Sequence, residues 1–364
     1  MRGLRRSESP FTLGVDEEVR YENHDAELID RVLQAVTDVR RGQGESAVWV
    51  RQYVPDCEGD HQFVIFFKPE VMAESKVRLQ RVLDLVLQLA SDSAVSLLAI
   101  RAIGWRYLGE HDLIASHYSV VNRISHEGRG AISHEAEVAL NENFEGELQQ
   151  GAEVIGAHRL LENYPQMSSL ALLRSNDNGV SKRLAMGTYA LASTIADKHY
   201  IVLNAFHPYQ LDTFVKEPNV LLVFEARSKM PWSTLRQQFA GSTDPSQASE
   251  GSIRRELLRH QSELGMQEVS RASNGVHVSA GPLEGMVEVR RFFGNPVADN
   301  ALAFAETCFG KDLVSSGLSA EAVERFSANP DLAIGNRLVS AFDVTEEMNA
   351  GDAVQLLARA SYPR

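Results

Sequence analysis

The chain of 364 residues is 44% apolar, which is enough for one large domain or for two to three ordinary domains with buried cores. Its formal net charge of -13 excludes broad binding to nucleic acid or to acidic membranes, because such binding requires clustered Lys and Arg. A local basic pocket is compatible with this charge, so any polyanion that the protein binds should be small.

The cysteines and the hydropathy pattern favour a cytoplasmic protein. Cys57 and Cys308 lie far apart and match no metal-binding spacing, so we expect reduced thiols rather than a disulfide. The arginines near the N-terminus have no apolar run behind them, unlike those of a secretory signal. Because no segment reaches the roughly 18 apolar residues of a membrane span, we also expect no membrane contact.

Residues 1–60 predict an N-terminal appendage of mixed α and β character. Apolar residues have helical spacing over 25–40, and residues 47–54 are typical of a strand. The following run, 62–67, is almost wholly apolar and ends in Lys68, as does a buried strand that delivers a charged side chain to its end. Lys68 is therefore the first candidate site residue, although a lysine at a strand end can also simply extend into solvent.

Residues 61–120 form the first part of the predicted core, in which strand and helix patterns alternate. Helical spacing over 74–89 is followed by extended character over 95–108. A short helical pattern then ends at Tyr118.

Residues 121–200 are predicted to be an insertion, because Gly, Glu, Asn and Ser become frequent and interrupt the preceding pattern. The histidines of this segment include His126, His134 and His158. No cysteine accompanies them, and their spacing matches no known ligand set. We expect these histidines to be solvated rather than to bind a metal.

Residues 201–294 form the second part of the predicted core and contain a loop suited to phosphate. A second buried-strand pattern covers 219–225, and the loop after it carries Arg236, Thr243 and Arg254. Guanidinium groups and hydroxyl donors match phosphate oxygens, so this loop could enclose a phosphate chain. Its composition also fits a solvated surface loop.

A candidate nucleophile follows this loop. His277 lies among the small and polar residues of 274–279, and Glu288 follows eleven positions later. In such a pair the histidine can be the nucleophile, and the carboxylate can be the acceptor that orients its ring. The pattern is weak alone and gains weight from the cations named above. Beyond it, residues 295–364 predict a helical C-terminal extension that could cover the core or form a subunit contact.

Taken in order, these segments resemble the nucleoside diphosphate kinase family. The matching motifs occur in the family's order and cover about 40% of the chain. They are Lys68-Pro69-Glu70 for the family's Lys-Pro-Asp, Ser116-His117-Tyr118 for Glu-His-Tyr, Phe206 for the first Phe of Arg-Pro-Phe-Phe, Arg236 to Pro245 for R-x3-G-x-T-N-P with one extra residue, Gly251-Ser252-Ile253-Arg254 for G-T-I-R, and Asn274, His277 and Ser279 for N-x-x-H-G-S-D, with Glu288 eleven positions after the histidine.

The chain departs from the family pattern beside the histidine and at the insertion. Val278 replaces the glycine after the histidine, and Ala280 replaces the aspartate. About 80 extra residues separate Tyr118 from Phe206. These departures bear on substrate choice and oligomer geometry more than on phosphoryl chemistry, because every charged catalytic position is retained.

The resemblance implies a ferredoxin-like α+β fold, with an antiparallel sheet and helices on one face, interrupted here by the insertion and followed by the helical extension. It implies a nucleoside diphosphate kinase-like phosphotransferase that uses ATP or another nucleoside triphosphate. Mg²⁺ would be bound through the nucleotide phosphates, without a protein ligand. The partners would be nucleotides and further copies of the chain, in a homo-oligomer that is at least a dimer.

The resemblance also implies a role for each matched residue. Neutral His277 would attack the γ-phosphate and become a phosphohistidine, while Glu288 accepts the proton of the other ring nitrogen. Lys68, Arg236, Thr243 and Arg254 would bind phosphate oxygens, Tyr118 would donate to the phosphate, Asn274 would touch the ribose, Phe206 would stack on the base, and Ser279 would support the pair of histidine and carboxylate.

Two other functions remain open. In the first, the phosphohistidine is kept, but the insertion forms a lid or recognises a different acceptor, such as a nucleoside monophosphate or a specialised metabolite. In the second, the protein is a non-catalytic nucleotide sensor whose appendages contact a partner. Decayed relatives usually lose the histidine or its cations, and this chain keeps both.

Overall fold

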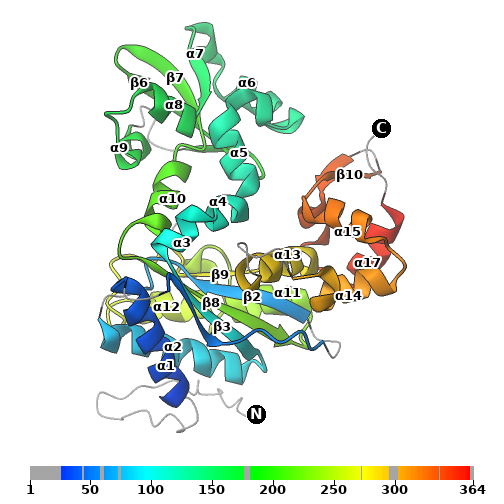
Figure 1. Ribbon diagram of the computed structural model, residues 1–364. Helices are drawn as coiled ribbons and strands as arrows, with labels where there is room; N and C mark the ends of the chain where they lie inside the picture. Colours follow the sequence, from blue (N-terminus) through cyan, green and yellow to red (C-terminus); the bar gives the residue numbers. More distant parts are fainter. Residues whose placement is uncertain are drawn as a thin grey trace, which may run out of the picture.

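The computed structural model describes residues 26–42, 45–57, 61–72, 75–175, 181–271, 273–294, 302–335 and 337–360. The first 25 residues of the predicted N-terminal appendage lie outside the described residues. The described chain combines helices with sheets (Figure 1), so the expected mixed α and β fold with an antiparallel sheet is confirmed.

A five-stranded antiparallel sheet forms the core, in the order β1-β3-β8-β2-β9. Its strands are β1 (Ala47–Arg51), β2 (His61–Phe67), β3 (Ser96–Gly104), β8 (Val220–Ser228) and β9 (Val276–Val278). β2 pairs with β8 on one side and with the short edge strand β9 on the other. This pairing sets His277 opposite Phe66 and so joins two segments that are far apart in the sequence.

Helices cover both faces of this sheet, because β2 is apolar on both faces. Phe63, Ile65 and Phe67 belong to one core and Val64 and Phe66 to the other, as the alternation of side chains along a strand requires. The first core includes α1 (Ala26–Arg40), α2 (Lys76–Asp92) and α12 (Ile253–Arg259), and the second includes α3 (Trp105–Glu110), α4 (Leu113–His117), α10 (His207–Val215) and α13 (Pro282–Phe293). The expectation of helices on one face is therefore wrong.

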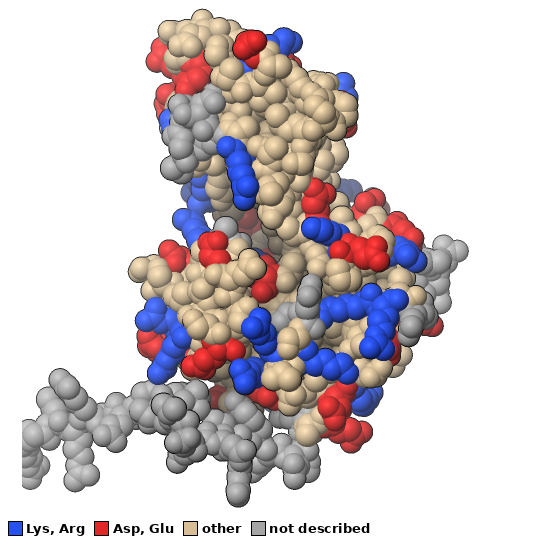
Figure 2. All heavy atoms as spheres, turned by 90° about the vertical axis from the view of Figure 1, so that its left-hand side faces the viewer, with Lys and Arg blue, Asp and Glu red and all other residues tan. Residues whose placement is uncertain are grey.

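The predicted insertion contains a sheet of its own and stands as a separate lobe above the core (Figures 1 and 2). Its strands, in the order β4-β7-β6-β5, are β4 (Glu153–Gly156), β5 (Lys182–Ala185), β6 (Thr188–Ile195) and β7 (Lys198–Leu203). Its helices are α5 (Ser119–Glu127), α6 (His134–Asn143), α7 (Glu145–Gln149), α8 (Ala157–Asn163) and α9 (Ser169–Arg174). On the face shown in Figure 2, Lys and Arg gather mainly below this lobe, over the core.

The C-terminal extension packs on α13, where it contacts Leu283, Met286 and Val287. Its elements are α14 (Cys308–Ser315), α15 (Ala320–Ser327), β10 (Asp331–Ile334), β11 (Arg337–Ser340), α16 (Ala341–Thr345) and α17 (Ala350–Arg359). The prediction of a helical extension therefore missed the β10–β11 hairpin. Its two strands have four residues each, which is too short for an alternating pattern to stand out from a helical one.

Cys57 and Cys308 form a disulfide, so the prediction of two reduced thiols is wrong. Their Cα atoms are 5.2 Å apart although 251 positions separate them in the sequence. The extension reaches the start of β2, where the backbone N–H of Cys308 donates to Oε1 of Gln62 at 2.9 Å. Disulfides are rare in reducing compartments, so this bond disfavours the expected cytoplasmic location. The location stays a prediction. None of the described helices is long and apolar enough to cross a bilayer.

Candidate active site

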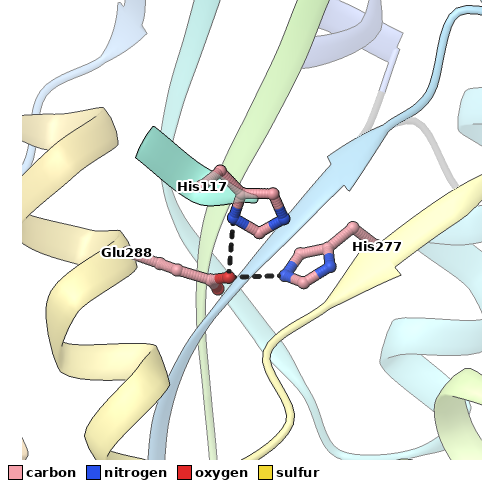
Figure 3. A group of neighbouring side chains, drawn as sticks. All are labelled: His117, His277 and Glu288. Atoms are coloured by element: carbon pink, nitrogen blue, oxygen red, sulfur yellow. Dashed lines mark ion pairs between the residues drawn. The ribbon is translucent and has the colours of Figure 1, made fainter. Parts of the chain in front are cut away.

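His277 lies on the edge strand β9, with its ring stacked on Phe66 of β2 at a centroid distance of 4.5 Å. Its side chain is 15% exposed. Nε2 of the ring points toward Glu288 of α13 and lies 2.7 Å from Oε1 of that carboxylate (Figure 3). The packing on Phe66 and the contact with Glu288 together fix the orientation of the imidazole.

Glu288 is fully buried and is held from two sides. Its Oε2 accepts a hydrogen bond from the hydroxyl of Ser279. The same hydroxyl accepts from the backbone N–H of Val64 at 2.8 Å, and the N–H of Ser279 donates to the carbonyl of Val64 at 3.1 Å. The carboxylate beside His277 is therefore anchored to the backbone of β2, the strand next to the edge strand β9.

His117, the last residue of α4, is a second histidine on the same carboxylate. Its Nδ1 lies 3.1 Å from Oε1 of Glu288, its side chain is 3% exposed, and its ring meets that of His277 at 4.5 Å. The motif comparison placed His117 beside Tyr118 but gave it no role. A histidine in the last turn of a helix is only a weak signal in the sequence, because it does not reveal which distant carboxylate the ring will meet.

The protonation of this group follows from burial and from mutual contacts. Burial lowers the pKa of His277 to about 4 and also lowers the pKa of His117, so both rings are neutral near pH 7. Burial by itself would raise the pKa of Glu288, but the interactions with His277 and His117 outweigh it and hold the pKa below its usual range. The site therefore pairs two neutral imidazoles with one carboxylate anion.

Glu284, one helical turn before Glu288 on α13, is a further carboxyl group that was not predicted. It accepts the backbone N–H of Ala280 at 2.9 Å. Burial, together with the negative charge of Glu288, raises the pKa of Glu284 to about 8. Two carboxyl groups with opposite shifts provide one proton donor and one anion near neutral pH. The spacing of four residues was visible in the sequence, but the burial that protonates Glu284 was not.

Lys68 and Asn274 meet at the end of β2. The Lys68 ammonium donates to Oδ1 of Asn274 at 2.8 Å, and Nδ2 of Asn274 donates to the carbonyl of Thr243 at 3.1 Å. Burial lowers the pKa of Lys68 to about 8. Three predicted residues from distant segments are therefore neighbours, although it is the backbone of Thr243 that makes this contact.

Arg236 and Arg254 bind the backbone on either side of His277. Arg254 donates to the carbonyl of Val276 at 3.2 Å, and Arg236 donates to the carbonyl of Val278 at 2.9 Å. Burial, and then the charge of Arg236, lower the pKa of Arg254 to about 10. Among the described residues, Nε of each arginine has no hydrogen-bond partner. The edge strand thus holds His277 between two guanidinium groups, each of which has a buried Nε donor that no described residue accepts from.

Two predicted residues occupy other parts of the surroundings. Tyr118 is next to His117, with ring centroids 4.5 Å apart, and burial followed by the charges of Glu70 and Glu288 raises its pKa. Phe206 lies before α10 and contacts Tyr189 of the insertion, with ring centroids 5.5 Å apart. Tyr118 therefore belongs to the histidine cluster, whereas the contacts of Phe206 are toward the insertion.

Comparisons with known proteins add little to this geometry. No family model and no curated protein matches the chain. Among solved structures, it is similar to a nucleoside diphosphate kinase from Encephalitozoon cuniculi, in its apo cubic form, with 14% identity, a TM-score of 0.30 and coverage of 65% of this chain and 92% of that chain. It is also similar to an NDP kinase from Pyrobaculum aerophilum, with 13% identity, a TM-score of 0.29 and coverage of 64% and 96%. TM-scores this low support no functional conclusion, which must come from the site.

The C-terminal extension also reaches the site. The backbone N–H of Glu347 donates to the carbonyl of Ala280 at 2.9 Å, immediately after Ser279. Glu346 lies 3.7 Å from Arg236 and forms an ion pair with it. The extension thus supplies a carboxylate to one of the two arginines that flank His277.

The arrangement suits the attack of a neutral imidazole on an anionic group. The carboxylate of Glu288 faces Nε2 of His277 and favours the tautomer with its proton on that nitrogen, which leaves the lone pair on Nδ1. The cations Lys68, Arg236 and Arg254 are positioned to attract negative charge to the same region.

Proposed function

We propose that the protein is a phosphotransferase that moves the γ-phosphate of a nucleoside triphosphate to a nucleoside diphosphate through a phosphohistidine on His277. The observation that carries this proposal is the neutral His277, whose Nε2 lies 2.7 Å from the Glu288 carboxylate, between the carbonyls that Arg236 and Arg254 bind. A nucleophile, an orienting anion and flanking cations are what phosphoryl transfer requires.

In the proposed first step, Nδ1 of His277 attacks the γ-phosphorus and forms the N–P bond. The bond from this phosphorus to the oxygen that bridges to the β-phosphate breaks, and its electron pair leaves on the diphosphate. The ring becomes positively charged, and the adjacent Glu288 anion stabilises it. In the second step, a terminal oxygen of the acceptor diphosphate attacks the phosphohistidine, and His277 returns to its neutral form.

The remaining predicted residues would bind and orient the nucleotide. Lys68, Arg236, Arg254 and the Thr243 hydroxyl would bind phosphate oxygens, Tyr118 would donate to the phosphate, Asn274 would contact the ribose, and Phe206 would stack on the base. Mg²⁺ would be bound by the phosphate oxygens of the nucleotide, where it would neutralise charge. These residues offer many hydrogen-bond donors and no carboxylate, so they suit phosphate oxygens and would leave the binding of Mg²⁺ to the nucleotide.

The strand order supports a ferredoxin-like core within this proposal. Without β1, the order β3-β8-β2-β9 corresponds to the second, third, first and fourth strands along the chain, and α2 connects the first two. This is the order of a β-α-β-β-α-β unit. The proposal includes the predicted domains, 1–60, 61–120, 121–200, 201–294 and 295–364, and at least a dimer as the assembly.

Labelling with a nucleoside triphosphate that carries radioactive γ-phosphate tests the nucleophile. We expect an adduct that is labile in acid and stable in alkali. His277→Ala should abolish it, and His134→Ala, which changes an exposed histidine of α6, should retain it. Absence of the adduct on the wild-type protein would contradict the proposal.

The acceptor is tested by adding nucleoside diphosphates to the isolated adduct. We expect loss of the label from the protein and its appearance in nucleoside triphosphates. An adduct that transfers only to a monophosphate or another metabolite would identify the alternative acceptor class. Nucleotide binding with no adduct would instead identify a sensor.

A further inference from the structure

Three buried ligand atoms from three different elements meet beside β2. They are Nδ1 of His117 from α4, Nε2 of His277 from β9 and Oε1 of Glu288 from α13, and all lie within 4.8 Å of one another. Oε1 is 2.7 Å from the His277 nitrogen and 3.1 Å from the His117 nitrogen (Figure 3). Two imidazoles and one carboxylate are a ligand set that suits Zn²⁺ and related divalent ions.

The three ligand atoms lie close together but are poorly directed for hydrogen bonds with one another. Although the distances are short, the geometry within the described residues gives none of the three atoms a hydrogen-bond partner. Buried polar atoms are rarely left in this state, and binding one metal ion is one of the few arrangements that satisfies all of them at once. If the carboxylate moves slightly away from the two rings, one ion can lie roughly 2 Å from each of the three ligand atoms, as Zn²⁺ requires.

We propose that His117, His277 and Glu288 form a binding site for one divalent transition-metal ion of the Zn²⁺ type, and that its occupancy excludes attack by His277. The exclusion rests on the proposed phosphotransfer function and follows from the chemistry of the ring. A neutral imidazole carries a single proton. If the lone pair of Nε2 binds the ion, the proton must be on Nδ1, which is the atom that would attack phosphorus.

The surroundings support the carboxylate ligand and set the selectivity. The Ser279 hydroxyl, held by the N–H of Val64, hydrogen-bonds to the second oxygen of Glu288 and orients the carboxylate as an outer-shell partner does. The charges of Lys68 and Arg291 act on the same region and oppose a dication. An ion must therefore gain strongly from imidazole binding, which favours Zn²⁺, Co²⁺ or Ni²⁺ over the oxygen-seeking Mg²⁺.

Titration of the full chain with Co²⁺ tests the site without reference to activity. We expect the visible absorption bands of a low-coordinate Co²⁺ complex, saturating at one ion per chain, displaced by Zn²⁺ and unaffected by Mg²⁺. His117→Phe keeps a ring against Phe66 and Phe292 but removes a ligand, and it should weaken binding by at least roughly 100-fold. His134→Ala should bind as the wild type does.

A wild-type chain without stoichiometric Co²⁺ binding would overturn the site, as would a His117→Phe variant of unchanged affinity that unfolds with the wild-type transition. The exclusion is tested by adduct formation with and without stoichiometric Zn²⁺. We expect Zn²⁺ to suppress the adduct in the wild type. In His117→Phe, we expect the same amount of adduct with and without Zn²⁺. An adduct that survives on the Zn²⁺-loaded wild type would overturn the exclusion. If the wild type forms no adduct in either condition, the phosphotransfer proposal and the exclusion built on it fail, while the Co²⁺ bands still decide the site.

Discussion

At the scale of single residues, two glutamates on one helix have opposite protonation states. Glu288 is anionic because two imidazoles and a serine hydroxyl surround it, and Glu284 is protonated because burial and the neighbouring anion disfavour a second charge. The difference arises from the partners of each side chain, since both belong to the same face of α13. A proton donor and an anion are thus held one turn apart on α13, with the anion beside His277.

Glu284→Gln should remove a pH dependence of stability. The pKa of Glu284 is about 8 in the folded protein and close to the ordinary 4.5 in the unfolded chain. Between these values the folded state binds more protons, so this residue makes the free energy of unfolding fall as pH rises from 4.5 to about 8. The variant should lack that fall, which amounts to more than about 1 kcal/mol.

Urea unfolding of both proteins across this pH range measures the difference between their stability curves. Glu321→Gln, in which the original carboxylate is 85% exposed, is the matched control and should follow the wild-type curve. Parallel curves for wild type and Glu284→Gln would show that Glu284 is ionised in the folded state.

At the scale of secondary-structure elements, the short strand β9 depends on the glycine before it. Gly275 has a φ of +83°, its N–H donates to Glu70, and its carbonyl accepts the N–H of Lys68. A Cβ atom at this position would lie 2.5 Å from Cδ1 of Leu257. The glycine therefore permits both the turn into β9 and the close packing of α12 beneath it.

Gly275→Ala should destabilise the protein more than Gly251→Ala. Gly251 has a similar φ of +78°, but a Cβ atom there would meet nothing within 4 Å. Both variants should lose about 1 kcal/mol from the positive φ. The collision with Leu257 should cost Gly275→Ala about 1 to 3 kcal/mol more, as overpacking of a core does.

Denaturant midpoints and slopes of the two variants give this comparison directly. The adduct on His277 should also decrease in Gly275→Ala, because the displaced turn carries Asn274 and precedes the histidine. Equal losses of stability in the two variants would mean that the packing around Gly275 can yield without cost.

At the scale of the whole molecule, the C-terminal extension is tied to the core by apolar packing, by polar contacts and by a disulfide. Its apolar residues pack on α13, Glu346 pairs with Arg236, and Cys308 is bonded to Cys57. The first contact is made on the side of α13 away from Glu288, so one helix carries both the carboxylate of the site and the contact with the extension. The insertion, by contrast, joins the core through α4, α5 and α10.

Replacing both cysteines with serine should lower stability by about 2 to 4 kcal/mol, because the bond closes a long loop in the unfolded chain. The unfolding transition of the double variant should match that of the fully reduced wild type. Thiol titration of the denatured, unreduced wild type should find no free thiol. Two titratable thiols in that sample would contradict the bond.

Part of this molecule follows from local sequence patterns. The apolar run before Lys68 predicted β2, and the mixed α and β class with an antiparallel sheet is confirmed. The spacing of His277 and Glu288 and the two arginines of the preceding loop suggested a phosphate site, and their proposed roles stay predictions. Such inferences are possible from the sequence because the periodicity of apolar residues and the chemistry of a side chain are properties of the chain itself.

Other features depend on which residues become neighbours in space, so they follow from the folded structure and not from local patterns. They include the second histidine on Glu288, the protonation of Glu284, the bond between Cys57 and Cys308 and the helices on both faces of the sheet. Burial changes a pKa, and proximity makes a disulfide, yet neither is written in the order of residues. The sequence therefore determined which groups the protein has for chemistry, and the fold decided which of them lie close enough to change one another's protonation or to form a bond.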